Sequence, residues 1–238
     1  EKVLTIETND GLKLFAWQIE AVIDSTTKGK RPGLALLLPM MRHTHDSYAP
    51  FTSELHKIGY TTIAFDMRGH GLSTKVHGET LTHDKMGVEQ FARMPSDIEA
   101  MFKDFKAKNP DAYNYDDVIV IGASIGANTA GILMRKPWLQ KCVLLSPGRD
   151  YRGLKPEEVM AVKGGTLGKQ VYIAAGIDDT YSAESSQWLY DNYLGLKVLK
   201  KYPGGFHGTD ILHQVKDADK ELLKWLTQKE SKPKKRFH

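Results

Sequence analysis

The feature that most constrains the fold is a series of short apolar runs that do not alternate with polar residues. Four continuous runs cover residues 33–39, 61–65, 117–121 and 141–145, and two more runs follow at 170–175 and 197–202. Continuous runs of this kind are typical of parallel strands that are buried on both faces. The sequence therefore predicts a parallel sheet with helices packed against both of its sides.

Helical patterns separate the runs, with apolar residues at spacings of three and four. They cover residues 46–58, 86–106, 125–134, 157–162, 183–194 and 209–227. The alternation of strands and helices predicts a doubly wound α/β fold with right-handed crossovers. Near the start of the chain, Asp10-Gly11 separates strand-like runs at 3–8 and 12–21. This arrangement predicts an antiparallel hairpin, so we expect a mixed, mostly parallel sheet.

The length of 238 residues fits a single α/β domain, and no linker composition interrupts it. We expect one domain over residues 1–228, followed by a basic tail at 229–238 that holds five Lys or Arg side chains and one Glu. Subtracting the tail from the totals of 33 basic and 29 acidic residues leaves 28 of each. This balance argues against a nucleic-acid partner, because binding to the phosphate backbone requires excess positive charge.

Two further classes of protein are excluded by what the sequence lacks. No apolar run approaches the roughly 18 residues of a transmembrane helix, so we expect no membrane insertion. Cys142 is the only cysteine, which rules out an intrachain disulfide. The chain begins at Glu1 rather than Met, so a cytoplasmic protein and an exported one with a removed leader both remain open. The oligomeric state is open as well.

The segment Gly122-Ala123-Ser124-Ile125-Gly126 follows a β-branched run and opens a helical pattern. A nucleophilic serine needs this arrangement, because a tight strand-to-helix turn raises its hydroxyl above the sheet and flanking glycines avoid clashes. The turn also directs the backbone N–H of Ile125 toward a developing negative charge. We expect Ser124 to be a nucleophile, although a plain turn of small residues is the alternative.

A serine nucleophile requires a base, and suitable residues follow two later strands. Asp178 and Asp179 come after the run at 170–175, and His207 comes after the run at 197–202. In α/β sheets, the carboxyl ends of the strands form the functional edge. His207 is the expected base, and Asp179 is preferred as the acid that orients it. Either aspartate could instead cap the following helix.

These residues resemble the α/β-hydrolase superfamily over about residues 12–226. Asp66–Ser73 is similar to the D-x-R-G-x-G-x-S loop of that superfamily, and Leu36 to Tyr48 to its oxyanion strand and loop. Gly176–Asp179 and His207-Gly208 resemble its acid and histidine loops. The resemblance implies an α/β-hydrolase fold with a catalytic Ser124, Asp179 and His207.

The chain departs from the superfamily at the end of its third strand. Relatives usually have His-Gly there, whereas this chain has Pro39-Met40. The resemblance then assigns the two oxyanion donors to the backbone N–H groups of Ile125 and Met41. Only residues 148–169 separate Ser146-Pro147, at the end of one run, from Gln170, at the start of the next, which leaves no room for a cap domain. This pattern is similar to the small capless esterases and dienelactone-hydrolase-like proteins.

Other constellations fit weaker hypotheses. The glycine spacing around Ser124 does not fit a dinucleotide loop, so no cofactor is expected. The cluster His43-Thr44-His45-Asp46 lacks a second ligand set, so substrate entrance or helix capping is favoured over a metal. Asp66, Arg68 and His70 are expected to brace loops by hydrogen bonds and charge pairs rather than to catalyse. Several side chains could face a cleft or simply pack: Met40, Met41, Tyr151, Tyr181 and Trp188.

Together these observations predict a metal-free serine hydrolase that cleaves small-molecule esters with small or short-chain acyl groups. A thioesterase, peptidase or perhydrolase could use the same three residues, because the fold alone does not select among them. A non-catalytic binding protein that kept the fold is the alternative from another class. A fluorophosphonate probe distinguishes it, since only an activated serine reacts.

Overall fold

The computed structural model describes residues 1–22, 29–162 and 168–228, so the expected tail at 229–238 lies outside the described residues. The strands are β1 (Lys2–Glu7), β2 (Leu12–Ile19), β3 (Gly33–Leu38), β4 (Tyr60–Asp66), β5 (Lys75–Val76), β6 (Glu79–Thr80), β7 (Val118–Ala123), β8 (Lys141–Leu145), β9 (Gln170–Gly176) and β10 (Leu196–Tyr202). The α-helices are α1 (Ala49–Lys57), α2 (Val88–Ala92), α3 (Met94–Lys108), α4 (Ile125–Leu133), α5 (Glu157–Met160), α6 (Thr180–Asn192), α7 (Asp210–Gln214) and α8 (Ala218–Thr227).

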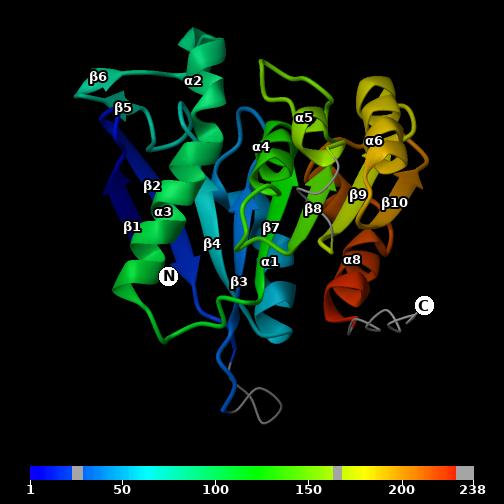
Figure 1. Ribbon diagram of the computed structural model, residues 1–238, viewed down its shortest axis with the longest axis horizontal. Coiled ribbons are helices and arrows are strands. Elements are labelled where there is room, and N and C mark those ends of the chain that lie inside the picture. Colours follow the sequence, from blue (N-terminus) through cyan, green and yellow to red (C-terminus); the bar gives the residue numbers. More distant parts are fainter. Residues whose placement is uncertain (23–28, 163–167, 229–238) are drawn as a thin grey trace, which may run out of the picture.

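A single mixed sheet organises the molecule (Figure 1). Its strands run in the order β10-β9-β8-β7-β3-β4-β2-β5-β6, and β1 pairs with β2. Neighbours are parallel from β10 through to β4, whereas β2 pairs antiparallel with β4 and with β1. The predicted hairpin and mostly parallel sheet are confirmed.

Alternate residues of the central strands contribute to two separate cores. In β3, Leu34, Leu36 and Leu38 belong to the core on one face, and Ala35 and Leu37 belong to the core on the other. The first core includes residues of α3, α4 and α6, and the second includes residues of α1, α7 and α8. Helices therefore cover both faces, which is why these strands have no polar side.

The chain order reverses at the centre of the sheet, where β3 lies between β4 and β7. Loops that follow β3 and β7 must diverge to opposite sides of the sheet, which opens a crevice beyond the carboxyl ends of these strands. The segment that starts at Pro39 follows β3, and Ser124 follows β7. The topology thus places the predicted nucleophile at the reversal point.

Two predicted helices are each divided in the structure. The pattern at 86–106 forms α2 and α3, with Pro95 in the first turn of α3. Proline suits a first turn because the N–H that it lacks has no partner there. The pattern at 209–227 forms α7 and α8, and Asp217 between them has φ +62°. Apolar spacing alone continues through both breaks, so periodicity missed them.

The outer parts of the sheet also differ from the prediction. Strand β10 is an edge strand with partly exposed residues, rather than a strand buried on both faces. The short strands β5 and β6 were not predicted, and each has only two residues. Between β8 and β9, the described residues form only the short helix α5, so this part of the described chain contains no cap domain. None of the described helices has the length and apolar character needed to cross a membrane.

Candidate functional site

Ser124 lies on a strained turn between β7 and α4. Its backbone angles are φ 53° and ψ −115°, a conformation that L-residues rarely adopt. A Cβ at Gly122 would lie 2.2 Å from the carbonyl oxygen of Gly126, so the two glycines let the turn close on itself. The local sequence therefore builds the elbow that the motif predicted.

The same turn packs against the end of β3. A Cβ on Gly126 would lie 2.1 Å from the carbonyl oxygen of Leu38 and 2.7 Å from that of Pro39. Only a glycine allows such a close approach of two backbones. This contact holds the loop that follows β3, which carries Met40 and Met41, beside the elbow.

His207 and Asp179 are brought together from the loops after β10 and β9. His207 Nδ1 lies 2.6 Å from Asp179 Oδ2, and the Asp179 side chain makes no capping hydrogen bond to α6. The Asp178 side chain is exposed, and its backbone N–H donates to the carbonyl oxygen of Gly204. The turn thus directs the second aspartate toward the imidazole, while the first faces solvent.

A buried serine anchors the histidine loop. Ser146 follows β8, has φ 52°, and is 2% exposed. Its hydroxyl accepts a hydrogen bond of 2.9 Å from the backbone N–H of Gly208. Because Gly208 follows His207 directly, this bond fixes the backbone that carries the imidazole.

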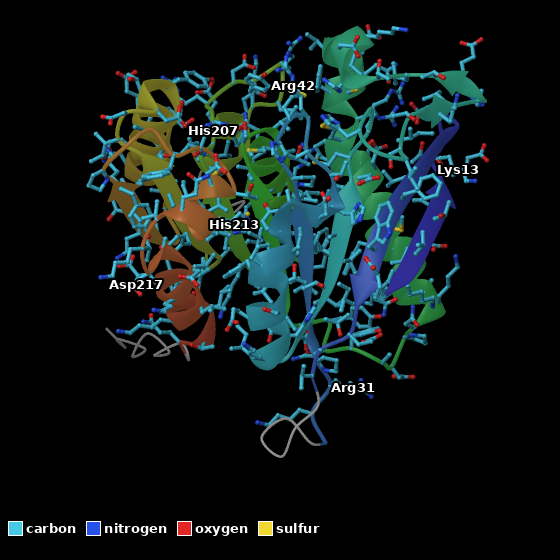
Figure 2. All side chains as sticks on the ribbon, turned by 180° about the vertical axis from the view of Figure 1, so that it is seen from behind. Lys13, Arg31, Arg42, His207, His213 and Asp217 are labelled. Carbon is cyan, nitrogen blue, oxygen red and sulfur yellow. The ribbon has the colours of Figure 1, made fainter. Side chains whose placement is uncertain are left out.

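These side chains line one open cavity of about 570 Å³ at the carboxyl edge of the sheet. Figure 2 shows His207 and Arg42 at this edge, on the same side of the molecule as the loops after β3. The lining residues are Met40, Met41, Arg42, His83, Asp84, Ser124, Asn128, Ser146, Gly148, Tyr151, Arg152, Asp179, Tyr181, Ser182 and His207. The predicted Ser124, Asp179 and His207 therefore share a single cavity.

Both predicted oxyanion donors neighbour Ser124, one along the chain and one in the cavity. Ile125 is the first residue of α4, so its N–H lies at the amino end of a helix dipole. Met41 lines the cavity together with Ser124. Among the described residues, no hydrogen bond joins the Ser124 hydroxyl to the His207 ring, a contact that often tightens only when substrate is bound.

The other predicted residues divide between the cavity and the scaffold. Met40, Tyr151 and Tyr181 line the cavity, whereas Trp188 packs under the guanidinium of Arg149 at 4.2 Å. His45 neither lines the cavity nor caps a helix; its ring stacks on Trp17 at 3.5 Å, and its Nδ1 lies 2.9 Å from Asp66 Oδ1.

The 66–73 loop contributes to what we call the bracing cluster: Asp10, Asp66, Arg68, His70 and Asp97. Arg68 is fully buried and forms paired bonds of 2.7–2.9 Å with Asp97 and Asp10. The hydrogen bonds from Arg68 hold the pKa of Asp10 far below its usual range, while burial raises the pKa of Asp97 to about 6. The expectation that this loop has a bracing role agrees with these contacts.

Sequence reasoning missed several residues of the cavity: Arg42, His83, Asp84, Asn128, Ser146 and Arg152. Ser146 could have been found, because it directly follows a predicted strand at the functional edge. Asn128 could also have been found, because it and Thr129 are the two polar residues of a helix whose other residues are apolar or glycine. Arg42 could have been found as well, because it follows Met41 in the loop assigned to the oxyanion donors, whereas the sequence did not show where the loop of Arg152 lies.

A metal site and a second cavity with catalytic side chains would be the alternatives to the cavity around Ser124. Within the described ranges, no group of three or more His, Cys, Asp and Glu side chains could hold a metal ion. A second cavity, of about 610 Å³, lies at the opposite edge of the sheet between residues 30–33 and 113–117. Its described lining contains no Ser, Cys or His side chain, so it offers no nucleophile with a base.

Comparison with known proteins gives one family match. Residues 33–172 match the model of a family described as serine aminopeptidase, S33. No curated protein matches the chain.

Solved structures are similar over nearly the whole chain. A thermostable carboxyl esterase from Bacillus coagulans superposes with a TM-score of 0.65 at 14% identity, covering 94% of this chain and 96% of that one. An esterase from Pyrococcus furiosus gives 0.66 at 20% identity, with 94% and 91% covered. A hydrolase from Pseudomonas aeruginosa PA01 gives 0.69 at 14% identity, with 95% and 98% covered. At these identities the likeness concerns the fold.

Proposed function

The chain belongs to the S33 serine aminopeptidase family of α/β-hydrolases, and from this premise we propose that it is a serine hydrolase that cleaves carboxylic esters with small or short-chain acyl groups. The observation that carries the proposal is the Asp179–His207 hydrogen bond of 2.6 Å, in the same cavity as Ser124 on its strained turn. An acid, a base and a nucleophile in one cavity are the parts that acyl transfer requires.

In the proposed reaction, His207 removes the proton of the Ser124 hydroxyl while the hydroxyl oxygen attacks the ester carbonyl. Asp179 accepts a hydrogen bond from Nδ1 of His207, which leaves Nε2 as the base and stabilises the imidazolium. The backbone N–H groups of Ile125 and Met41 hold the negative oxygen of the tetrahedral intermediate.

The intermediate collapses when His207 returns the proton to the leaving alcohol, which produces an acyl ester of Ser124. A water molecule, deprotonated by His207, then attacks the acyl carbonyl and releases the acid. The cycle regenerates the free serine, so the proposed reaction consumes one water for each ester cleaved and needs no cofactor.

The shape of the cavity supports the choice of a short acyl group. It is open, it carries charged and polar side chains such as Arg42, Asp84 and Arg152, and no cap domain covers it in the described part. A long alkyl chain would bury little surface there. We expect turnover of p-nitrophenyl esters to fall as the acyl chain grows, and rates that rise steadily from acetate to palmitate would contradict this part of the proposal.

The direct test of the proposed reaction is removal of the hydroxyl. Ser124→Ala should lower kcat/KM for p-nitrophenyl acetate by about 10⁴-fold or more, without changing the thermal unfolding profile. Ser53→Ala is the matched control, because Ser53 is exposed on α1 and its hydroxyl bonds only to the carbonyl oxygen of Pro50. Retained turnover in the Ser124 variant would refute the assignment.

A peptidase activity is the second candidate, because the matched family is described as a serine aminopeptidase. Asp84 on the cavity wall is a carboxylate that could hold a protonated α-amino group. Comparing L-alanine p-nitroanilide with p-nitrophenyl acetate separates the two. Preference for the anilide would replace the ester proposal, and absence of anilide cleavage would exclude this candidate.

A further inference from the structure

Two arginine side chains line the cavity without an acidic partner. Arg42 and Arg152 are both exposed, and neither forms an ion pair with any residue in the described part of the chain. By contrast, Arg68 and Arg149 are each paired with a carboxylate at 2.6–2.8 Å. Within the described chain, neither cavity guanidinium therefore has its charge balanced by a carboxylate or its N–H donors occupied by hydrogen bonds.

Arg152 occupies a turn position that normally requires another residue type. Tyr151 and Leu154 exchange backbone hydrogen bonds of 3.1 and 2.9 Å, and between them Arg152 and Gly153 have φ of 53° and 79°. Positive φ at both central residues defines a type I′ turn, for which Asn-Gly is the preferred pair. An arginine at the first central position therefore strains the backbone, and this turn carries a charged side chain where Asn is usual.

Arg42 occupies a similar position in the loop after β3. The N–H of His43 donates to the carbonyl oxygen of Met40 at 3.1 Å, and Arg42, the third residue of this turn, has φ 67°. Turns with positive φ at their third residue favour glycine. Both unpaired arginines thus have a positive φ, a backbone conformation that glycine or asparagine adopts more readily.

Non-glycine residues with positive φ concentrate around this cavity. Arg42, Ser124, Ser146 and Arg152 all line it, and in the described ranges only His77 and Asp217 have such a backbone elsewhere. Backbone strain of this kind is energetically unfavourable and clusters at functional sites. The two arginines therefore share the backbone property of the proposed nucleophile.

The loop that carries Arg152 is fixed at both ends and in its middle. Buried Asn128 accepts a hydrogen bond from the N–H of Gly148 and donates to the carbonyl oxygen of Leu154, each at 2.8 Å. The Tyr181 hydroxyl donates to the carbonyl oxygen of Asp150. The guanidinium itself lies over the rings of Phe91 and Tyr151 at 5.4 and 6.0 Å. These contacts hold the backbone of the loop in place and position the Arg152 guanidinium against the two rings.

The remaining charges of the cavity do not neutralise this pair. Asp179 is engaged by His207, and Asp84 forms no ion pair with either arginine. Beside Asp84 lies His83, whose ring stacks on His70 at 4.9 Å. The cavity thus contains two guanidiniums without an ion pair, and the Asp84 carboxylate, which accepts a hydrogen bond from the Thr82 side chain, balances neither of them.

We propose that Arg42 and Arg152 form an anion subsite beside Ser124, which holds a carboxylate or phosphate group of the ester substrate. Guanidinium groups match these planar or tetrahedral anions through paired N–H donors. The inference rests on the proposed function and adds a substrate class to it: esters that carry a negative charge on their acyl or alcohol part.

The experiment compares anionic and neutral esters of matched shape. 4-Acetoxybenzoate against its methyl ester tests a charge on the alcohol part, and mono-p-nitrophenyl adipate against p-nitrophenyl hexanoate tests a charge on the acyl part. Arg42→Gln with Arg152→Gln should lower the anionic-to-neutral ratio of kcat/KM by about tenfold in at least one pair. The wild-type ratio should also fall between about 20 mM and about 500 mM NaCl, because salt screens exposed charges.

Arg31→Gln is the matched control. Arg31 lies at the opposite end of the molecule from Arg42 and His207 (Figure 2), in an exposed pair with Asp111 at 3.7 Å. It should leave both ratios unchanged. If the double variant also leaves both ratios unchanged, the anion subsite is refuted even when neutral esters are still cleaved. Inhibition by inorganic phosphate stronger than that by acetate would identify phosphate as the preferred group, and the reverse would identify carboxylate.

A binding measurement keeps this test independent of turnover. Calorimetric titration of 4-acetoxybenzoate and mono-p-nitrophenyl adipate into Ser124→Ala protein should show, for at least one of them, binding that weakens about tenfold when both arginines are also changed to Gln. Equal affinities with and without the arginines for both ligands would overturn the subsite. Loss of all esterase activity together with arginine-dependent binding would instead refute only the proposed function.

Discussion

The bracing cluster and the cavity use the same residue types in opposite ways. In the bracing cluster, Arg68 is fully buried and its donors are satisfied by Asp10 and Asp97. In the cavity, Arg42 and Arg152 are exposed and have no carboxylate partner in the described part of the chain. The first arrangement satisfies its charges within the fold, and the second leaves them for a ligand.

The histidines of the two regions also differ in how far they are exposed. His70 of the bracing cluster is 4% exposed, and its Nδ1 lies 2.9 Å from the carbonyl oxygen of Arg68. The His207 side chain is 42% exposed and contacts a carboxylate at the cavity wall. The difference common to both comparisons is burial: the bracing cluster holds Arg68 and His70 inside the fold, whereas Arg42, Arg152 and His207 are accessible from the cavity. Changes in the first region should therefore affect stability, and changes in the second should affect activity.

The largest expected effect concerns the acid of the cavity. Asp179→Asn should lower kcat for p-nitrophenyl acetate by about 10⁴-fold, because an amide no longer selects the tautomer or stabilises the imidazolium. Thermal unfolding should be nearly unchanged. Asp178→Asn is the control and should retain activity, since its side chain is exposed. Equal losses in the two variants would break the distinction between the aspartates.

The next largest effect concerns the stability of the bracing cluster. Arg68→Ala leaves the buried carboxylate of Asp97 without its cation and should lower the free energy of unfolding by about 3–5 kcal/mol. Urea denaturation followed by circular dichroism measures this loss. Arg93→Ala removes an exposed partner of Asp10 at 3.5 Å and should cost no more than about 1 kcal/mol. Similar losses in both variants would contradict the contrast between buried and exposed pairs.

The smallest expected effect is a pH dependence from His70. Burial lowers the pKa of His70 below its usual 6.5, so the unfolded chain binds a proton more readily than the folded one. This contribution to stability is complete above about pH 6.5 and is lost as the pH falls toward the lowered value. Wild-type protein should therefore lose more unfolding free energy than His70→Asn when the pH drops from about 7 to about 5.

The comparison with a variant is needed because Asp97 titrates in the same range with the opposite sign. Its pKa is raised to about 6, so protonation favours the folded state and stability declines as the pH rises through that value. Asp97 is present in both proteins, and its contribution largely cancels in the difference. A difference between wild type and His70→Asn that does not change with pH would contradict the role assigned to the buried imidazole.

The sequence was sufficient to predict the sheet, because the strands are buried on both faces and their apolar runs have no polar interruption. It also predicted the tight turn at Ser124, since Gly122 is required by a backbone contact with Gly126, four residues along the chain. These features depend on local chemistry, which a single sequence displays directly.

Other features depend on contacts between distant segments. The choice of Asp179 over Asp178 is made by the direction in which the turn after β9 points each side chain. The breaks at Arg93 and at residues 215–217 interrupt helices whose apolar spacing continues. Arg42 and Arg152 line the same cavity although they follow different strands, and the residue type arginine does not indicate the positive φ that both adopt.

The central claim is that the hydroxyl of Ser124 is activated by His207, and covalent labelling tests it most directly. Folded protein is treated with a fluorophosphonate, digested and examined by mass spectrometry. We expect one adduct per chain on the peptide that contains Ser124, and we expect it to be lost in His207→Ala. No adduct, or an adduct on another serine of the cavity such as Ser146, would contradict the account.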